Sequence, residues 1–140
     1  MADLGFDALA YARSWAAAWN AGDIEAVLVH FDDNVVFTSP LAARVVAGSR
    51  GNIRGKDALR RYWSAAVDRT PRPEFHLLSV CAGVDSLVIA FRNERGEARA
   101  EVLRFRDGLV IEGHGTYAVT AAGDRTKRRR AACAPCRLDP

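Results

Sequence analysis

The sequence is poor in cysteine, with 3 among 140 residues, too few for the disulfide framework of a small secreted protein. Cys81 stands in an apolar segment, and we expect it to be a buried small hydrophobe rather than a nucleophile. Cys133 and Cys136 have CxxC spacing, but the chain has no second pair and no nearby histidine to complete a zinc site. Redox and structural-zinc chemistry are therefore not expected, and no metal is predicted.

Long apolar runs are also missing. Apolar residues make up 49% of the chain, yet none of their runs approaches the roughly 18–20 residues that span a bilayer. Residues 1–5 lack the basic stretch of a secretory signal. A chain of this length suits one domain. The sequence thus predicts a single cytoplasmic domain with no membrane partner, and no cofactor is expected.

Positive charge is scarce outside one short segment. The formal net charge is +3, but residues 120–140 carry six basic and two acidic side chains, a net +4, so the other 119 residues carry a net −1. The main part of the chain has no electrostatic footprint for nucleic acid, which is not expected as a partner. The basic run at 127–130 lies in a stretch with little to bury. We predict a domain of residues 1–119 and a disordered tail of residues 120–140.

The chain does contain a helical pattern followed by strand patterns. Apolar residues at spacings of three and four predict a first helix that stops at Gly22, and Asp23 is placed to cap a second helix running to about His30. After these helices we expect a turn at 32–34, a strand at 35–38, a helical turn at 41–46 and a helix at 56–69. Four strands are then expected, at 74–82, 86–93, 97–106 and 109–120. Helices followed by strands indicate an α+β fold with the helices on one side of a curved sheet. The apolar positions of the first helix are Phe6, Leu9, Ala10, Ala12, Trp15, Ala16 and Trp19.

Alternation along the predicted strands selects one candidate functional residue. In the strand at 97–106, Glu101 shares a face with Leu103 and Phe105. A carboxyl group among apolar side chains loses hydration, which raises its pKa and makes it a general acid or hydrogen-bond donor. No other carboxylate of the predicted sheet has this placement. The apolar face of the preceding strand consists of Leu87, Ile89 and Phe91.

The three histidines are not arranged for catalysis or metal binding. His76 and His114 alternate with inward-facing neighbours and are expected on the outer face of the sheet. His30 ends a predicted helix, where a cation suits the helix dipole. No two histidines have metal-ligand spacing with an acidic partner.

Five short motifs occur along the chain in a characteristic order. They are Trp-Asn-Ala-Gly-Asp at 19–23, Phe-Asp-Asp at 31–33, Phe-Thr-Ser-Pro at 37–40, Gly-Lys-Asp-Ala-Leu at 55–59 and Phe-Arg-Asp-Gly-Leu-Val at 105–110. Together they resemble the nuclear transport factor 2-like superfamily and its SnoaL-like domains, over roughly residues 6–119. The resemblance implies a cone-shaped α+β domain, in which a curved mixed or antiparallel sheet wraps round N-terminal helices and encloses a pocket, as in ketosteroid isomerases and polyketide cyclases.

The resemblance also assigns roles to residues. Matching the strand around Leu103 to ketosteroid isomerases puts Glu101 at their oxyanion-stabilising aspartic acid. The same match puts Trp15 at their tyrosine and Ser39 at their base. Matching the last strand to SnoaL-type cyclases puts Gly115 at their acidic residue. Only Glu101 keeps the required chemistry, because an indole lacks useful acidity and a lone serine is not a general base.

Two functions follow, and the sequence leaves both open. The first is a domain that binds a small hydrophobic molecule in a conical pocket, with enzyme activity of isomerase, cyclase or dehydratase type in which Glu101 is the acid or hydrogen-bond donor. The second is a noncatalytic dimeric module for ligand binding or protein interaction. The side chains expected to line the pocket are Trp15, Trp19, Phe37, Ser39, Tyr62, Trp63, Phe91, Leu103 and Tyr117.

The outer face of the predicted sheet is more apolar than a solvated face needs to be. Such faces pair in two-fold dimers in many proteins of the superfamily that the motifs resemble. We therefore expect a homodimer through this face. Its apolar residues are predicted to be Val80, Val88, Ala90, Val102 and Val110.

Overall fold

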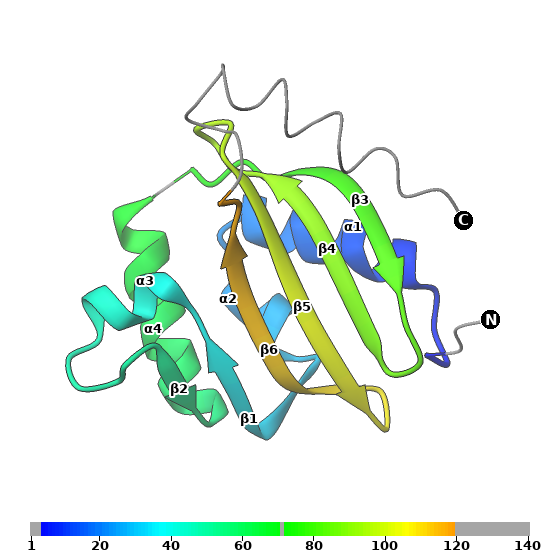
Figure 1. Ribbon diagram of the computed structural model, residues 1–140, viewed down its shortest axis with the longest axis horizontal. Coiled ribbons are helices and arrows are strands. Elements are labelled where there is room, and N and C mark those ends of the chain that lie inside the picture. The colour runs from blue at the N-terminus through cyan, green and yellow to red at the C-terminus, as the bar shows by residue number, and fades with distance from the viewer. Residues whose placement is uncertain (1–3, 71, 120–140) are drawn as a thin grey trace.

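In the computed structural model, which describes residues 4–70 and 72–119, helices pack against a curved, unclosed sheet of six strands (Figure 1). The α+β fold class is confirmed. None of the described helices combines the length and hydropathy that a bilayer crossing requires. The predicted tail at 120–140, with Cys133 and Cys136, lies outside the described residues, as does Thr120 at the end of the last predicted strand.

The helices begin where side chains satisfy their first free N–H groups. Asp7 caps α1 (Ala8–Asn20) by accepting a hydrogen bond from the backbone N–H of Ala10. Asp23 caps α2 (Ile24–Leu28), and this second cap was predicted from the sequence. Gly22, with φ +69°, makes the left-handed turn between them. The helix α2 ends at Leu28, short of the predicted end. The remaining helices are α3 (Pro40–Val45), capped by the Ser39 hydroxyl, and α4 (Lys56–Arg69), whose bounds match the prediction.

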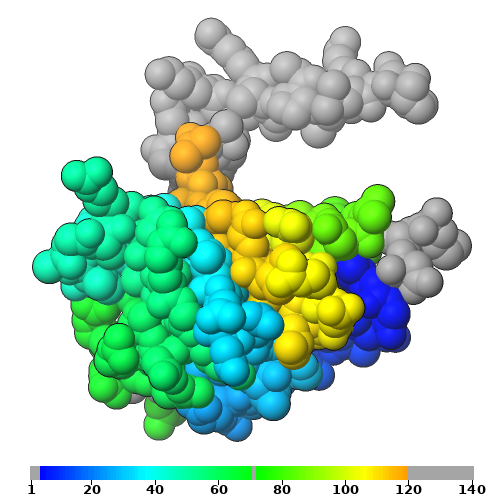
Figure 2. All heavy atoms as spheres, turned by 90° about the horizontal axis from the view of Figure 1, so that it is seen from below, coloured from blue at the N-terminus to red at the C-terminus, as the bar shows by residue number. Residues whose placement is uncertain are grey.

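The sheet has the strand order β2-β1-β6-β5-β4-β3. All neighbours are antiparallel except β1 and β6, which are parallel. Seen from below, β1 lies between the green segment that contains β2 and α4 and the yellow segment at the β5–β6 turn (Figure 2). The strands are β1 (Phe31–Thr38), β2 (Asn52–Arg54), β3 (His76–Ala82), β4 (Ser86–Arg92), β5 (Ala98–Arg106) and β6 (Leu109–Tyr117).

Two parts of the predicted strand pattern are wrong. The polar residues 32–34, expected as a turn, belong to β1. The register of β1 with β6 shifts between Phe31 and Val36, so this polar stretch lies in an irregular part of the strand where Asp33 and Asn34 remain exposed. The short strand β2 lies between the predicted helical turn at 41–46 and the predicted helix at 56–69, where no strand was expected.

Register shifts also correct the predicted outer face. The pairing of β3 with β4 shifts between Leu77 and Ser79, which sets Val80 opposite the buried Ile89. The pairing of β5 with β6 shifts between Arg104 and Phe105, so Val110 lies opposite Phe105 and is fully buried. Both valines were expected outside and lie inside. Cys81, expected to be buried, pairs with Val88 on the outer face and is exposed.

The core fills the space between the inner face of the sheet and the helices. The predicted inner positions of β4 and β5 are buried, with Leu87, Ile89 and Leu103 at 0% exposure. Trp63 of α4 is at the centre, its ring 5.0 Å from that of Trp19. It makes similar edge contacts with Phe31 and Phe37, so α1, α4 and β1 meet around one indole. In α1, Ala12, Trp15, Ala16 and Trp19 are buried, whereas Leu9 and Ala10 are exposed.

Candidate functional site

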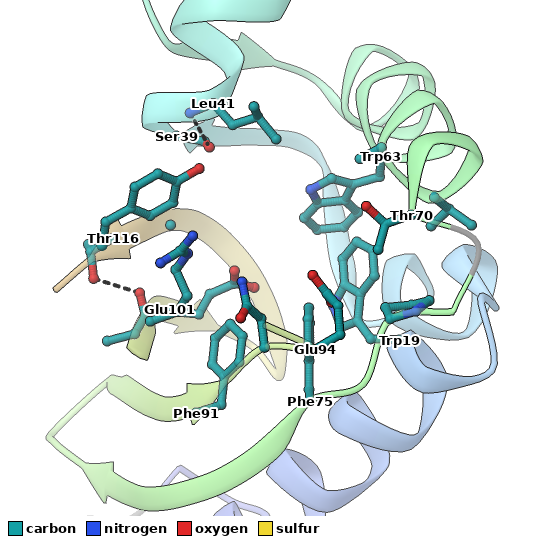
Figure 3. A pocket seen from close by; sticks show the side chains of 18 of the residues that line it. Trp19, Ser39, Leu41, Trp63, Thr70, Phe75, Phe91, Glu94, Glu101 and Thr116 are labelled. Atoms are coloured by element: carbon teal, nitrogen blue, oxygen red, sulfur yellow. Dashed lines mark hydrogen bonds between the residues drawn. The ribbon is translucent and has the colours of Figure 1, made fainter. Parts of the chain in front are cut away.

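A cavity of about 250 Å³ opens between the inner face of the sheet and the helices α1, α3 and α4. In the close-up, Glu101 lies between Phe91 on the sheet and Ser39 and Trp63 across the cavity (Figure 3). Aromatic side chains from α1, α4 and the sheet form much of the cavity wall, as they often do in small-molecule sites. The sequence-predicted residues that line it are Trp19, Phe37, Ser39, Tyr62, Trp63, Phe91, Glu101 and Tyr117.

Two of the predicted pocket residues lie behind the cavity wall. Leu103 has no exposed surface and belongs to the hydrophobic core between the inner face of the sheet and the helices. Trp15 is 3% exposed, stacks against Phe75 and makes an edge contact with Phe91. Neither side chain is part of the lining, but Trp15 reaches the site indirectly through its indole N–H.

Glu101 is the buried carboxyl group of the cavity. Strand alternation places it on the inner face of β5, between Ile89 of β4 and Gly115 of β6, and it is 8% exposed. The indole Nε1 of Trp15 donates to its Oε2 over 3.2 Å. Burial disfavours the charged form and raises the pKa of Glu101 from an ordinary 4.5 to about 8, although the Trp15 hydrogen bond partly opposes the shift. At neutral pH the side chain is therefore mostly a protonated acid.

The two carboxyl oxygens of Glu101 have different surroundings. Oε2 accepts the Trp15 hydrogen bond. Oε1 has no hydrogen-bond partner among the described residues. It is not among the unpaired polar atoms that are completely buried in the described part of the chain. Because an N–H donor already faces Oε2, we place the acidic proton on Oε1, from which it can be donated into the cavity.

A hydroxyl pair faces the carboxyl group from the other side of the cavity. Ser39 Oγ and the Tyr62 hydroxyl are 3.0 Å apart, and Ser39 Oγ also accepts from the backbone N–H of Leu41. Burial raises the pKa of the Tyr62 hydroxyl, and its hydrogen bond to Ser39 only partly opposes this. The pair can therefore donate or accept hydrogen bonds, but neither group is a general base at neutral pH.

Two glycines of β6, Gly113 and Gly115, lie close to Phe37, and only Gly115 lines the cavity. A Cβ atom added to Gly115 would lie 3.8 Å from both Ser39 Oγ and the Phe37 ring, which is ordinary contact distance. A Cβ at Gly113 would lie 2.8 Å from the Phe37 ring, which is too close. Gly115, which the resemblance aligns with an acidic residue, therefore leaves a small gap beside Ser39. Gly113 cannot be replaced by a larger residue without displacing Phe37.

The mouth of the cavity contains charged residues that the sequence reasoning did not select. Arg99 is the inner-face residue two positions before Glu101, so the alternation that found Glu101 could also have found Arg99. Arg95 and Glu94 come from the β4–β5 turn, and Arg44 from α3. Nothing in their local sequence marks these three, because only the folded chain brings them together.

A second polar network lies on the outer face of the sheet. His114 pairs with Val102 there, as expected for an outward residue, and hydrogen bonds to Thr38 through Nδ1. Its Nε2 is 2.7 Å from Glu112, which also pairs with Arg104. The hydrogen bond to His114, followed by the charge of His114 and the contacts with Arg104, lowers the pKa of Glu112. The network links β1, β6 and β5 on the face opposite the cavity. No metal-binding group of three His, Cys, Asp or Glu side chains occurs in the described part of the chain.

The family of the chain follows from its match to known domains. The model of the SnoaL-like domain family matches residues 12–114. This chain is a SnoaL-like domain. The match confirms the resemblance read from the motifs. No curated protein is significantly similar to this SnoaL-like domain.

Solved structures agree with this family and fold. A SnoaL-like protein of unknown function from Burkholderia thailandensis is 34% identical, with a TM-score of 0.75 over 79% of this chain and 93% of that one. Bal32a, from a soil-derived mobile gene cassette, is 26% identical, with a TM-score of 0.66 over 86% and 95% of the two chains. TerC, co-crystallised with polyporic acid, shares the fold at 14% identity, with a TM-score of 0.63 over 86% and 97%.

Proposed function

We propose that this SnoaL-like domain binds a small, largely apolar molecule with a carbonyl group, and that Glu101 donates a hydrogen bond or proton to the carbonyl oxygen. The observation that carries the proposal is the buried, protonated carboxyl group whose Oε1 faces an aromatic cavity while Trp15 holds Oε2. A neutral acid inside an apolar cavity is a strong donor to an oxygen on which negative charge develops.

The walls of the cavity support an apolar, flat occupant. Phe37, Trp63 and Phe91 present ring surfaces, and Phe75 completes the wall near the mouth. A cavity of about 250 Å³ holds a molecule of one or two rings. TerC, which shares the fold, was co-crystallised with polyporic acid.

The reaction class we propose is a cofactor-independent isomerisation, cyclisation or dehydration in which polarising a carbonyl is the protein's main contribution. Glu101 would donate its proton to the carbonyl oxygen and take the same proton back when the carbonyl of the product re-forms, while a carbon-bound proton that the reaction moves would pass to and from solvent water. Ser39 and Tyr62 would orient the other end of the molecule through their hydroxyl groups. Among the described lining residues, Glu94 at the mouth is the only other carboxylate, so this proposal assigns no protein base.

A panel of neutral aromatic ketones, beginning with 1-tetralone, tests this proposal. Ketones that fit should raise the melting temperature of the wild-type chain, because they bind the folded state alone. Glu101→Gln should keep affinity within about tenfold but suppress turnover of any ketone that the wild type converts. Glu112→Gln removes a carboxylate from the outer face and should leave both properties unchanged. Failure of every ketone to stabilise the wild type would contradict the proposal.

The second candidate function is a noncatalytic dimeric module for ligand binding or protein interaction. The absence of a paired base among the described lining residues favours it over the enzyme. It predicts ketone binding without turnover, and equal behaviour of wild type and Glu101→Gln in every activity assay. The homodimer is proposed for either function, through the half-exposed apolar strip formed by Val88, Ala90 and Val102 on the outer face.

A further inference from the structure

Arg99 is a largely buried cation in the wall of the cavity. It lies on the inner face of β5, opposite Phe91 in β4 and Tyr117 in β6. Its side chain is 18% exposed, and its guanidinium carbon lies 3.9 Å above the centre of the Tyr117 ring. Stacking on this ring fixes the plane of the guanidinium group.

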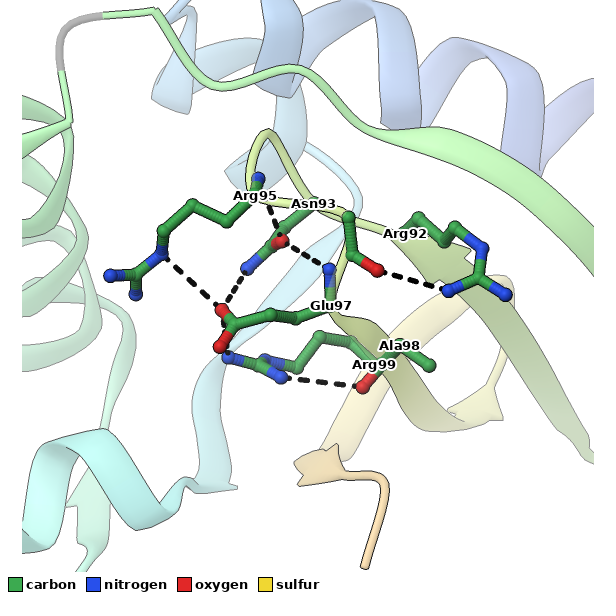
Figure 4. Close-up of polar contacts among 7 residues, drawn as sticks. Arg92, Asn93, Arg95, Glu97, Ala98 and Arg99 are labelled. Carbon is green, nitrogen blue, oxygen red and sulfur yellow. Dashed lines mark hydrogen bonds and ion pairs between the residues drawn. The ribbon is translucent and has the colours of Figure 1, made fainter. Parts of the chain in front are cut away.

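The hydrogen bonds of Arg99 leave much of its donor capacity unused. One terminal nitrogen donates to Glu97 Oε1 over 3.0 Å, and the other donates to the carbonyl oxygen of Ala98 over 3.3 Å. A guanidinium group has five N–H donors, so three have no partner among the described residues. In Figure 4, Arg95 and Arg99 approach the Glu97 carboxylate from two sides. One carboxylate is thus shared by two cations.

The charges around the mouth do not balance. Arg44, Arg95 and Arg99 line the cavity, and among the described residues the acidic side chains that line it or pair with these cations are Glu94, Glu97 and Glu101. The hydrogen bond from Asn93, and then the charges of Arg99 and Arg95, lower the pKa of Glu97. Glu97 is therefore ionised, yet one positive charge remains in excess. Glu101 does not supply the missing negative charge, since burial keeps it protonated and it makes no ion pair with Arg99.

We propose that the ligand of this cavity is an oxo acid, whose carboxylate binds the free N–H groups of Arg99 at the mouth while its carbonyl oxygen accepts from Glu101. The inference rests on the proposed function and narrows its substrate class. Residues two apart on a strand are about 6.5–7 Å apart, so the two groups of the ligand are separated by a short linker or one ring. A planar guanidinium group matches a carboxylate through two parallel hydrogen bonds.

The same hairpin provides a matched control. Arg92 belongs to β4 on the outer side and donates to the carbonyl oxygen of Gly96, so it also braces the β4–β5 turn (Figure 4). It does not line the cavity. Arg92→Gln and Arg99→Gln therefore remove the same charge and a similar backbone contact, and only the second removes a cation from the cavity.

The test measures the affinity of the purified chain for aromatic oxo acids of increasing size, each paired with its methyl ester. The smallest acid is 4-oxo-4-phenylbutanoate. Calorimetric titration at pH 7 should show that the wild type binds an acid at least about tenfold more tightly than its ester, because a charge-assisted bidentate contact is lost in the ester. Arg99→Gln should abolish this preference and keep the ester affinity. Arg92→Gln should keep both.

The outcomes separate this inference from the proposed function. If an ester binds and its acid binds no better, or if Arg99→Gln retains the preference, the carboxylate assignment is wrong and the carbonyl proposal stands. If neither acids nor esters bind the wild type, this inference is wrong, and if the neutral ketones also fail to stabilise it, the proposed function is wrong as well. Arg99→Lys keeps the charge without the planar fork and should show an intermediate preference. Melting temperatures of all variants show whether a lost affinity reflects a lost fold.

Discussion

At the scale of single residues, the proton on Glu101 is linked to the stability of the fold. Its pKa is about 8 in the folded chain and near 4.5 in the unfolded one. Between these values the folded state binds one proton more than the unfolded state, so the free energy of unfolding falls as pH rises. Below about pH 4.5 both states are protonated, and above about pH 8 both are ionised, so the slope disappears at both ends.

We predict that Glu101→Gln removes this slope. Between pH 5 and 8 the wild type should lose up to about 1.4 kcal/mol of stability per pH unit relative to the variant. Urea unfolding of both chains across this range measures the difference, and the NMR titration of the Glu101 carboxyl carbon gives its pKa directly. Burial also raises the pKa values of Tyr11 and Tyr62, so these neighbours stay neutral throughout. A carboxyl pKa at or below 4.5 would refute the proposed role of Glu101.

The two glycines of β6 should respond oppositely to the same substitution. Gly113→Ala forces a Cβ to within 2.8 Å of the Phe37 ring and should cost about 1–3 kcal/mol. Gly115→Ala places a Cβ at ordinary contact distance and should leave stability unchanged or raise it by about 0.5–1 kcal/mol, since glycine weakens a strand. Chemical denaturation of the pair provides the comparison. Equal costs would mean that the gap beside Ser39 is not present in solution.

Glu101 could be predicted from the sequence and Arg44 could not, for one physical reason. Side chains alternate along a strand, so two apolar neighbours at even spacing, Leu103 and Phe105, reveal the face on which Glu101 lies. Arg44 enters the cavity because α3 turns back after β1, and no periodicity records that path. Trp15 was placed near the site by the resemblance, but its role as a donor to Glu101 required the packed structure.

At the scale of elements, the short helix α2 depends on contacts at its two sides. It has five residues, too few to be stable alone. Asp23 caps its first turn, and Glu25 pairs with Arg60 of α4 at 2.7 Å, an exposed contact that contributes little. The cap is therefore the stronger of the two constraints, and α2 in turn packs against both α1 and α4.

Removing the cap should lower stability by a modest, predictable amount. Asp23→Ala is expected to cost about 1 kcal/mol, because the backbone N–H of Ala26 loses its acceptor. Asp23→Asn retains an acceptor and should cost only a few tenths of that amount. Thermal unfolding of the two variants measures the difference. Equal destabilisation would show that the charge of Asp23, rather than its hydrogen bond, supports the helix.

The ends of a helix or strand could be predicted where nearby residues in the sequence stop it. The inner and outer faces of a strand could not be predicted where they depend on its pairing with another strand. The bounds of α4 follow from its apolar stripe and the residues that stop it. The faces of Val80 and Val110 depend on register shifts, which exist only between paired strands and leave no mark in either sequence. A single extra residue reverses inside and outside for every position beyond it.

At the scale of the whole molecule, the predicted boundary after residue 119 is open to a direct test. A chain that ends at Ala122 should unfold cooperatively, with a melting temperature within about 2 °C of the full-length value, because the buried residues of the described ranges 4–70 and 72–119 all precede Val119. Differential scanning calorimetry of both chains is the measurement. Loss of a cooperative transition would mean that residues beyond Ala122 belong to the folded unit.

The proposed homodimer makes a second prediction at this scale. Val102 lies in the middle of the outer face, paired with Val88 and His114, and Val102→Lys should convert a dimer to a monomer by burying an unpaired charge at the interface. Light scattering at micromolar concentration measures the mass. Val84→Lys is a suitable control, since Val84 is 88% exposed in the β3–β4 turn. A monomeric wild type would contradict the proposal.

The parallel pairing of β1 with β6 has a consequence for how the chain acquires its fold. Thr38 and His114 hydrogen bond across 76 positions of sequence. During synthesis, β1 therefore emerges long before its main partner and has only the short β2 beside it. The strands β3 to β6 can pair as consecutive hairpins, but β1 can join this sheet only after the long loop to β6 closes, which slows the last step of folding. The N-terminal helices and their tryptophans consequently stay uncovered until β3 and β4, the strands next to Trp15, have left the ribosome.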